Sequence, residues 1–431
     1  MADKKISELT SIAGASLDKS TDVIPVVDTS AGETKKITVS ELFIGGSDFD
    51  EDITVNDVTV GRGSGDVSAN TALGNGALEN NTTGINNVAN GYQALFNNTT
   101  GGSNVASGFQ ALFNNATGRH NTSSGFRALL NNTTGINNVA NGYQALRNNT
   151  TGINNVASGH QALHSNTTGN NNVAAGTSAL YSNTTGINNV ATGTNALRSN
   201  TTGSNNTSSG YRALFNNTTG INNVASGRES LYSNTTGSNN TANGYLALYS
   251  NTTGGSNVTS GRESLYSNTT GSSNVSTGNA ALYRNTTGSN NTATGTNSLF
   301  NNTTGNNNTA SGGQSLYLNT TGINNTADGY QALYSNTEGS YNCAYGRSAL
   351  NTNTTGSYNT ALGYDAEALS NTADNQIAIR AGDTKWYSSA GSPEGVLTAG
   401  VGSMYTRTDG GTGTTLYVKE TGTGNTGWVA K

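Results

Sequence analysis

Hydrophobic and polar positions repeat along most of this chain, and each returns at every seventeenth position. Glycine recurs at this spacing from Gly74 to Gly363, and a second glycine lies ten residues further on in each copy. Leucine keeps the same step from Leu78 to Leu350, and two asparagine series accompany it. No insertion interrupts about seventeen consecutive copies, so we expect one structural unit stacked many times.

Each copy has the composition of a β-solenoid rung and not of a helical hairpin. It carries two fixed glycines, several asparagines and paired threonines, which are poor helix formers. In one copy, residues 87–90 and 93–96 could be extended, and turn-forming residues separate them. Two short strands with tight corners describe one rung, and glycine supplies backbone angles that a Cβ forbids. At about 4.8 Å per rung, the shaft would be on the order of 80 Å long.

Two positions of the repeat are candidates for the interior; each is named here by one residue and includes its equivalents in the other copies. The Val88 position holds Val or Thr in nearly every copy and predicts an inward ladder of β-branched side chains. The Leu95 position is invariably leucine and predicts the core of each rung. Cys343, the only cysteine, falls on the Val88 position and is interpreted as a small buried spacer. The predicted core ladder therefore contains Val88, Leu95, Leu112, Leu129, Leu146 and Cys343.

The rung has a thin core for its length. It offers one leucine, one valine or threonine, two alanines and one aromatic residue for burial. Burying a large apolar side chain contributes roughly 1.5–3 kcal/mol, whereas ordering the backbone costs roughly 1–2 kcal/mol per residue. Stacked asparagines can add ladders of amide hydrogen bonds, because identical side chains lie about 4.8 Å apart. We also expect sister chains to associate laterally and bury a further face.

The repeat is flanked by segments of different composition. Residues 1–48 contain two predicted strands, at 22–28 and 35–39, and are expected to form a small N-terminal module. Residues 49–73 are expected to cap the first rung, and residues 74–372 to form the shaft. After Gly363 two additional residues are expected to break the register. Residues 373–431, which hold both tryptophans, are predicted to fold as a C-terminal β domain with strands at 376–380, 385–387, 401–407, 414–419 and 426–429.

Charge is sparse and unevenly spread. The net charge is −5, and no lysine occurs between Lys36 and Lys385. Nine arginines and five acidic residues are scattered between Gly74 and Gly363, which is unlike the dense basic stripe of a nucleic-acid surface. No apolar run is long enough for a membrane span, and the first residues do not resemble a signal peptide. We therefore expect a soluble chain without nucleic-acid binding or membrane insertion.

Candidate catalytic groups are few. Glu229 and Glu263 occupy the same repeat position two rungs apart, roughly 10 Å by strand spacing, and each follows an arginine. A carboxylate pair that cleaves polysaccharide would need a separation of about 5 to 9.5 Å, so this pair is only the nearest approach to one, and surface salt bridges are the favoured interpretation. His160 and His164 share one rung, yet no metal-ligand spacing accompanies them. We predict a protein that is not an enzyme and has no cofactor or metal.

An aromatic stripe provides candidate contact residues. The Phe96 position is aromatic in most copies, whereas the Tyr92 position is variable, which suggests an exposed face. The stripe is interpreted as a structural ladder or subunit interface, and stacking against sugars is the alternative. The candidates for glycan, receptor or interface contacts are Phe96, Tyr232, Tyr249, Tyr266, Trp386 and Trp428.

Two resemblances connect these features. The motif Asn-Asn-Val-Ala-x-Gly-x-x-Ala, as at residues 86–94, resembles the head repeat of trimeric autotransporter adhesins, which form a left-handed parallel β-roll in a homotrimer. Residues 6–9, 22–28 and 34–39 look like the N-terminal module of many bacteriophage fibre proteins. Residues 402–411, 415–420 and 424–429 are similar to a C-terminal module of phage fibres and related virion proteins.

The resemblances imply an all-β, homotrimeric β-solenoid fibre in a bacteriophage virion, synthesised in the host cytoplasm. The N-terminal module would attach it to a baseplate, neck or capsid protein. The C-terminal domain would fold the tip or bind a host glycan or protein. A head or neck appendage with a purely structural role is the alternative, and a bacterial trimeric adhesin or a polysaccharide-cleaving tailspike are further ones. The expected absence of a signal peptide and of a C-terminal anchor argues against the adhesin.

Overall fold

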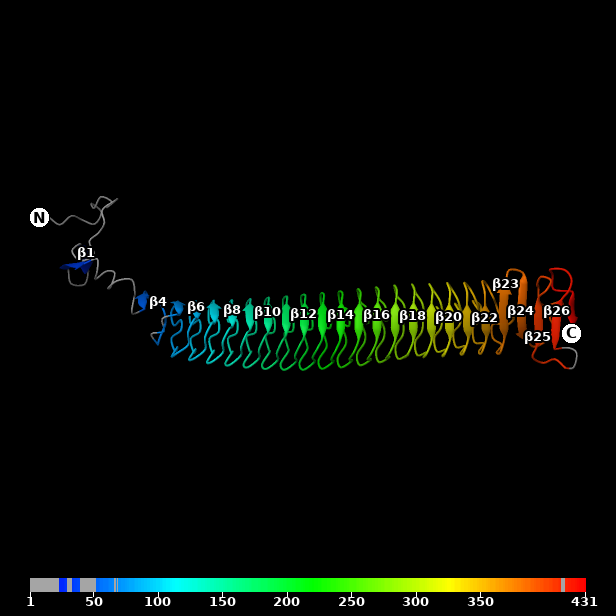
Figure 1. Cartoon of the computed structure of the whole chain (residues 1–431), viewed down its shortest axis with the longest axis horizontal. Coiled ribbons are helices and arrows are strands. Elements are labelled where there is room, and N and C mark those ends of the chain that lie inside the picture. Colours follow the sequence, from blue (N-terminus) through cyan, green and yellow to red (C-terminus); the bar gives the residue numbers. More distant parts are fainter. Residues whose placement is uncertain (1–22, 29–32, 39–51, 66, 68, 412–414) are drawn as a thin grey trace, which may run out of the picture.

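The chain forms a long rod of stacked rungs, seen from the side in Figure 1. The structure is a computed structural model that describes residues 23–28, 33–38, 52–65, 67, 69–411 and 415–431. In these residues all regular structure is β, and no helix occurs. The strands are β1 (Val23–Asp28), β2 (Glu33–Thr38), β3 (Ile53–Val55), β4 (Val58–Gly61), β5 (Thr71–Leu73), β6 (Val88–Asn90), β7 (Val105–Ser107), β8 (Thr122–Ser124), β9 (Val139–Asn141), β10 (Val156–Ser158), β11 (Val173–Ala175), β12 (Val190–Thr192), β13 (Thr207–Ser209), β14 (Val224–Ser226), β15 (Thr241–Asn243), β16 (Val258–Ser260), β17 (Val275–Thr277), β18 (Thr292–Thr294), β19 (Thr309–Ser311), β20 (Thr326–Asp328), β21 (Cys343–Tyr345), β22 (Thr360–Leu362), β23 (Ile377–Ala381), β24 (Thr384–Ser389), β25 (Met404–Arg407), β26 (Leu416–Lys419) and β27 (Trp428–Ala430).

Two hairpins precede the shaft. Strands β1 and β2 pair antiparallel with Val23 opposite Thr38, close to the predicted bounds, and the remaining features expected in residues 1–48 lie outside the described residues. Strands β3 and β4 form the second hairpin through Asn56 and Asp57, both with left-handed φ values of 47° and 65°. Such a turn matches the twist of the strands that it joins. Strand β4 then pairs antiparallel with β5 and covers the first rung.

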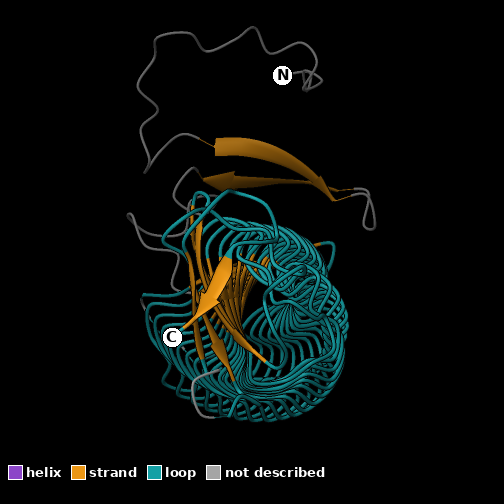
Figure 2. Ribbon diagram, turned by 90° about the vertical axis from the view of Figure 1, so that its right-hand side faces the viewer, coloured by secondary structure: helices purple, strands orange, loops and turns teal. Residues whose placement is uncertain are grey.

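The shaft is a β-solenoid with one parallel strand per rung. Each short strand pairs in register with the equivalent strand of the next rung, as Val88 does with Val105. Figure 2 shows these strands along one side of the rod and loops around the rest. The expected second strand at residues 93–96 is wrong. Gln93 and Leu95 both adopt a left-handed φ of 52°, so this segment is a turn whose amides donate to the neighbouring rungs on either side.

The expected inward ladder at Val88 is also wrong. Val88 is 39 % exposed, and the inward residue of each strand is the next one, Ala89, which is completely buried. Successive side chains of a strand point to opposite faces, so only the middle residue of three can enter the core. The leucines Leu95, Leu112, Leu129 and Leu146 are fully buried in the same core as this alanine ladder. Their bulk leaves room for little more than alanine, serine or threonine at the strand.

Glycine is required where adjacent rungs approach most closely. Gly108, with φ 136°, follows the strand of its rung, and a Cβ there would lie 2.6 Å from the carbonyl oxygen of Gly125. A Cβ on Gly101 would collide with the carbonyl of Gly118 in the next rung and with the side chain of Asn98. Both glycine series therefore mark points where the backbone itself is the packing surface.

Two buried asparagine ladders run through the interior, as predicted. In one, the amide nitrogen of Asn98 donates to Oδ1 of Asn81 at 2.8 Å. In the other, the backbone N–H of Asn104 donates to Oδ1 of Asn87 at 3.0 Å. These contacts recur rung after rung, so the side chains hydrogen-bond one another in the core where water is excluded.

The sheet continues without a register break into the C-terminal region. Thr360 pairs in parallel with Ile377, which is again the seventeenth residue after it, so the two additional residues expected after Gly363 do not exist. Glu367 occupies the leucine position of this last rung, and the leucine that suggested a shift, Leu369, is exposed. Strands β24 to β27 then extend the same sheet, with β24 and β25 parallel and the other pairs antiparallel. Tyr387, Leu397, Ala399, Tyr405 and Trp428 form the core there.

Candidate functional site

The shaft presents two chemically distinct surfaces. The first, called the sheet face, consists of the Val88 and Asn90 positions from β5 to β22, which point outward from the strands. Valines on it are about two-fifths exposed, for example Val156 at 39 % and Val258 at 46 %. Asp328 is the only charged residue at these positions between Thr71 and Leu362. The sheet face is therefore a long, nearly uncharged strip of small and β-branched side chains.

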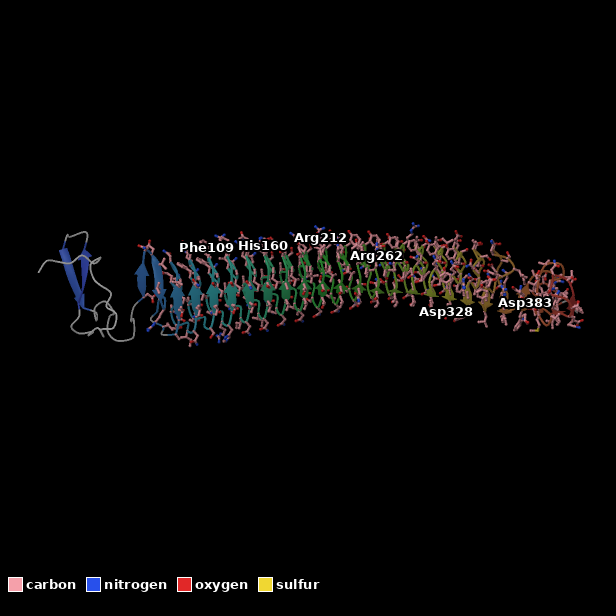
Figure 3. All side chains as sticks on the ribbon, turned by 90° about the horizontal axis from the view of Figure 1, so that it is seen from above. Phe109, His160, Arg212, Arg262, Asp328 and Asp383 are labelled. Atoms are coloured by element: carbon pink, nitrogen blue, oxygen red, sulfur yellow. The ribbon has the colours of Figure 1, made fainter. Side chains whose placement is uncertain are left out.

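The second surface, called the aromatic–arginine edge, consists of the Tyr92, Gln93, Phe96 and Asn97 positions. These residues follow the glycine after each strand and flank the left-handed turn that carries the buried leucine. Because every rung makes the same turn, each position forms a row along the rod. Figure 3 shows Phe109, His160, Arg212 and Arg262 along one long edge and Asp328 near the opposite one.

A continuous ladder of half-buried rings lies on this edge. Neighbouring rings are 5.1–5.3 Å apart between centroids and nearly parallel, with interplanar angles of 4–14°. Rung spacing sets this distance, and offset stacking is a favourable arrangement for aromatic pairs. The ladder contains Phe215, Tyr232, Tyr249, Tyr266, Tyr283, Phe300, Tyr317 and Tyr334.

The Tyr92 position forms a second, more exposed row. Near its start Tyr92, Phe109, Phe126, Tyr143 and His160 stack at 5.0–5.2 Å. Further along, tyrosine and arginine alternate: the Arg228 guanidinium carbon lies 5.6 Å from the Tyr211 ring and 5.9 Å from the Tyr245 ring. Arg262 lies 5.7 Å from the same Tyr245 ring. Each guanidinium is thus placed on an aromatic face, which fixes a positive charge at the surface.

Two tyrosines and one histidine of the edge have shifted pKa values. Burial, followed by Tyr232 and Glu229, raises the pKa of Tyr249 above its ordinary value. Burial, followed by Tyr283 and Glu263, raises the pKa of Tyr266. Burial and then the charge of Arg147 lower the pKa of His164, which stacks on Tyr181. These shifts favour the uncharged form of all three rings.

The two glutamates considered as a catalytic pair are engaged with arginine. Oε1 of Glu263 lies 3.0 Å from a guanidinium nitrogen of Arg262, and Oε2 of Glu229 lies 3.9 Å from Nε of Arg228. The salt-bridge interpretation is confirmed for both. Within the described ranges no group of three or more His, Cys, Asp or Glu side chains could hold a metal ion. Likewise, the described part of the chain has no helix that could cross a membrane.

The predicted contact residues lie in three different environments. Phe96 stacks on Phe113, and Tyr232, Tyr249 and Tyr266 belong to the ring ladder, so all four lie half-buried on the aromatic–arginine edge. Trp386 is 41 % exposed on β24. Trp428 is wrong as a contact residue, because it is only 6 % exposed and its indole N–H donates to the carbonyl of Leu397 at 3.0 Å. It packs edge-to-face against Tyr405 in the C-terminal core.

Cys343 does not belong to the core either. It lies half-buried on the sheet face, in line with Thr326 and Thr360 on the neighbouring strands. Burial raises the pKa of its thiol, and a hydrogen bond with Tyr345 partly opposes this. The higher pKa disfavours the nucleophilic thiolate.

Sequence reasoning missed the arginines of the edge as a set. Their signal was present in the single row Tyr211, Arg228, Tyr245 and Arg262, whose members occupy one position of four successive copies. Comparison with protein-family models, curated proteins and solved structures found no match for this chain. The features that bear on function are therefore the two surfaces and the resemblances of the repeat and the ends.

Proposed function

We propose that this chain is a non-enzymatic subunit of a bacteriophage virion fibre, which assembles as a homotrimer and contributes to attachment at the host surface. The observation that carries the proposal is the sheet face. Exposed valines recur on this nearly uncharged face from Val88 to Val275, and contiguous exposed apolar side chains are typical of interaction surfaces. Burying this strip between parallel shafts adds the apolar burial that the thin rung lacks.

The assignment to a virion is supported by the ends of the chain. Residues 22–39 and 402–429 resemble modules of phage fibre proteins, and a stiff rod between two such modules fits a spacer. In this proposal the N-terminal module joins the fibre to a baseplate, neck or capsid protein. The C-terminal β domain forms the tip, and three chains give each fibre several identical weak contacts, which raises avidity.

The oligomeric part is tested with the full-length chain by light scattering. We expect three times the chain mass for the wild type and dissociation for a variant with Val156→Asp, Val173→Asp and Val190→Asp on the sheet face. The matched control is Asn279→Asp, which adds a charge at an exposed position of the other surface. A wild-type monomer at micromolar concentration, or an unaffected triple variant, contradicts the proposed interface.

The attachment role is tested by competition. Purified full-length trimers are added to bacteria before virions that carry the fibre, and adsorption is counted as plaques. Reduced adsorption supports attachment. Antibodies against the chain show whether the virions carry it. Virions that these antibodies label, but whose adsorption the free trimer does not reduce, favour a structural head or neck appendage. Shortened host polysaccharide after incubation with the trimer would overturn the non-enzymatic assignment.

A further inference from the structure

We propose that the aromatic–arginine edge binds a linear acidic polysaccharide that lies along the rod and carries a carboxylate on every second sugar. This inference rests on the proposed function and deepens it, because it assigns the glycan contact to the side of the shaft and names the chemistry recognised. Three observations support it: the distribution of charge, the alternation of residues in one row, and the spacing of that row.

Positive charge is concentrated on this edge. Of the nine arginines between Gly74 and Gly363, only Arg119 lies at another position of the repeat. The other eight are Arg127, Arg147, Arg198, Arg212, Arg228, Arg262, Arg284 and Arg347. Only three acidic residues share the edge with them, Glu79, Glu229 and Glu263. Eight positive against three negative groups leave an excess of five positive charges on a surface that is otherwise aromatic and polar.

The best-defined part of the edge alternates two kinds of contact. Tyr211 and Tyr245 are each about two-fifths exposed. The side chain of Arg228, which lies between them, is 60 % exposed, and that of Arg262, on the rung after Tyr245, is 63 % exposed. Arg212 adds a further guanidinium, 5.1 Å from the Tyr211 ring and 5.5 Å from the Phe215 ring. Arg228 and Arg262 cover the two faces of the Tyr245 ring, so a tyrosine of this row offers a sugar its ring edge and its hydroxyl group. Guanidinium groups bind carboxylates through paired hydrogen bonds.

The spacing of the row selects the ligand. Equivalent residues on adjacent rungs are about 4.8 Å apart, so tyrosine recurs every two rungs, or about 10 Å, and arginine does the same one rung out of step. An extended, equatorially linked polysaccharide advances by about one rung per sugar. A polymer that alternates a neutral sugar with a uronic acid therefore places each neutral sugar beside the edge of a tyrosine and each carboxylate beside an arginine.

Packing against another copy does not explain this edge. An interface core is depleted of charge, and a buried guanidinium needs a counter-charge. The shaft has only five acidic residues between Gly74 and Gly363, and Glu229 and Glu263 already pair with arginines of their own rungs. The nearly uncharged sheet face is the better surface for a second copy, which leaves the aromatic–arginine edge open to solvent.

The test measures binding of full-length trimers to hyaluronan, which alternates glucuronate with a neutral N-acetylated sugar. The ligand control is the same polymer with its carboxylates converted to amides. We expect hyaluronan to bind at least tenfold more tightly than the amidated polymer, and the affinity to fall as salt is raised, because the contacts are ionic. Equal binding of both polymers would overturn the inference.

Variants locate the site. Arg228→Gln together with Arg262→Gln is expected to weaken hyaluronan binding at least tenfold, whereas Arg119→Gln, the matched control off the edge, changes it less than twofold. Glu229→Gln together with Glu263→Gln is expected to strengthen binding about threefold, since two arginines lose their competing partner. This gain is not expected if the arginines only support the fold. A weakening by Arg119→Gln as large as that of the double arginine variant would contradict the site.

Failure of this inference is distinguishable from failure of the proposed function. Light scattering and circular dichroism first establish that each variant remains a folded trimer. Trimers that compete with virions for bacteria but ignore hyaluronan would overturn the polysaccharide assignment alone. Trimers that bind hyaluronan through Arg228 and Arg262 but do not compete with virions would support the site and contradict the attachment role.

Discussion

The side chains of Asn87 and Asn98 donate to the same acceptor, the carbonyl oxygen of Gly101, each at 2.9 Å. The two asparagines belong to separate ladders. Their meeting point needs a residue without a side chain, because a Cβ on Gly101 would collide with Asn98 itself. The recurrence of two asparagines and one glycine in every copy is therefore a single hydrogen-bonded unit and not three independent preferences.

Replacing one asparagine of a ladder should destabilise the shaft. The Asn200 amide donates to Asn183 and Gly203 at 2.8 Å each, and its oxygen accepts from Asn217 at 2.9 Å. Asn200→Ala removes the donor to Oδ1 of Asn183, at about 1–3 kcal/mol for an unsatisfied buried group, and leaves the Asn217 amide only its bond to Gly220. Urea denaturation followed by circular dichroism should show a lower midpoint. The exposed Asn279→Ala should unfold at the wild-type midpoint, and an equal loss for both variants would contradict the role of the ladder.

A methyl group at the glycine that follows each strand should be equally disruptive. Gly108→Ala introduces a Cβ 2.6 Å from the Gly125 carbonyl oxygen at a φ of 136°. Overpacking and the strained backbone together predict a loss of about 2–5 kcal/mol in the free energy of unfolding. Gly424→Ala is the control, because a Cβ at this position would have no other atom within 4 Å. The comparison is made by thermal unfolding, and coincident melting curves for the two variants would refute the steric argument.

The last rung should show a pH-dependent weakness. Glu367 stands where other rungs have leucine, and burial raises the pKa of its carboxyl, although the N–H and hydroxyl of Thr352 donate to it and partly oppose this. The folded state then binds more protons than the unfolded state, so stability falls as pH rises. The contribution is fully present below the unfolded-state pKa of about 4.3 and is lost as pH rises through the higher folded-state value.

Glu367→Gln should therefore raise the melting temperature of the C-terminal region at pH 7 and lose this advantage below about pH 4. Differential scanning calorimetry between pH 3 and pH 8 measures it. Glu338→Gln, at an exposed position, serves as the control and should leave the profile unchanged. A Gln variant that is less stable than wild type at pH 7 would show that the carboxylate is stabilising there instead.

Whole rungs should be removable without loss of the fold. Deleting residues 206–256 removes three complete copies of the repeat and joins equivalent positions, so the rod should shorten by about 14 Å and still unfold cooperatively. Deleting residues 206–255 removes one residue fewer and moves every later leucine and asparagine off its ladder. Small-angle scattering and circular dichroism distinguish the two. A stable, folded product from the second deletion would contradict the register.

The regular part of the fold was predictable because residues seventeen positions apart occupy equivalent places in successive rungs. The leucine and asparagine ladders follow from the constant length of the repeat and in-register stacking, whatever the shape of the rung. Which neighbour in a strand points inward was not predictable. Hydrophobicity favoured Val88 over Ala89, but the buried leucine in the same core leaves space only for the smaller side chain.

Two further features carried no usable local signal. Leucine strongly prefers negative φ, so nothing in the sequence indicates that Leu95 and its equivalents adopt left-handed angles. After Gly363, Leu369 suggested a shifted register, yet the pairing of Thr360 with Ile377 shows that a glutamate simply replaces the core leucine. For the candidate site, the aromatic rows and the alternation from Tyr211 to Arg262 were visible in the sequence. That the other arginine-bearing positions lie on the same edge needed the geometry of the turn.

The left-handed turn at Leu95 also determines how such a rod can grow. A left-handed backbone costs about 1–2 kcal/mol for an L-residue with a side chain, and most rungs contain three such residues. Only an adjacent rung offers the acceptors that offset this cost, as the carbonyl of Ala111 does for the N–H of Leu95. An isolated rung is therefore a poor folding nucleus. Folding of successive rungs along the axis must start from a segment that is already folded. The hairpin of β3 and β4 that covers β5, and the sheet of β24 to β27 at the other end, are the segments able to provide that start.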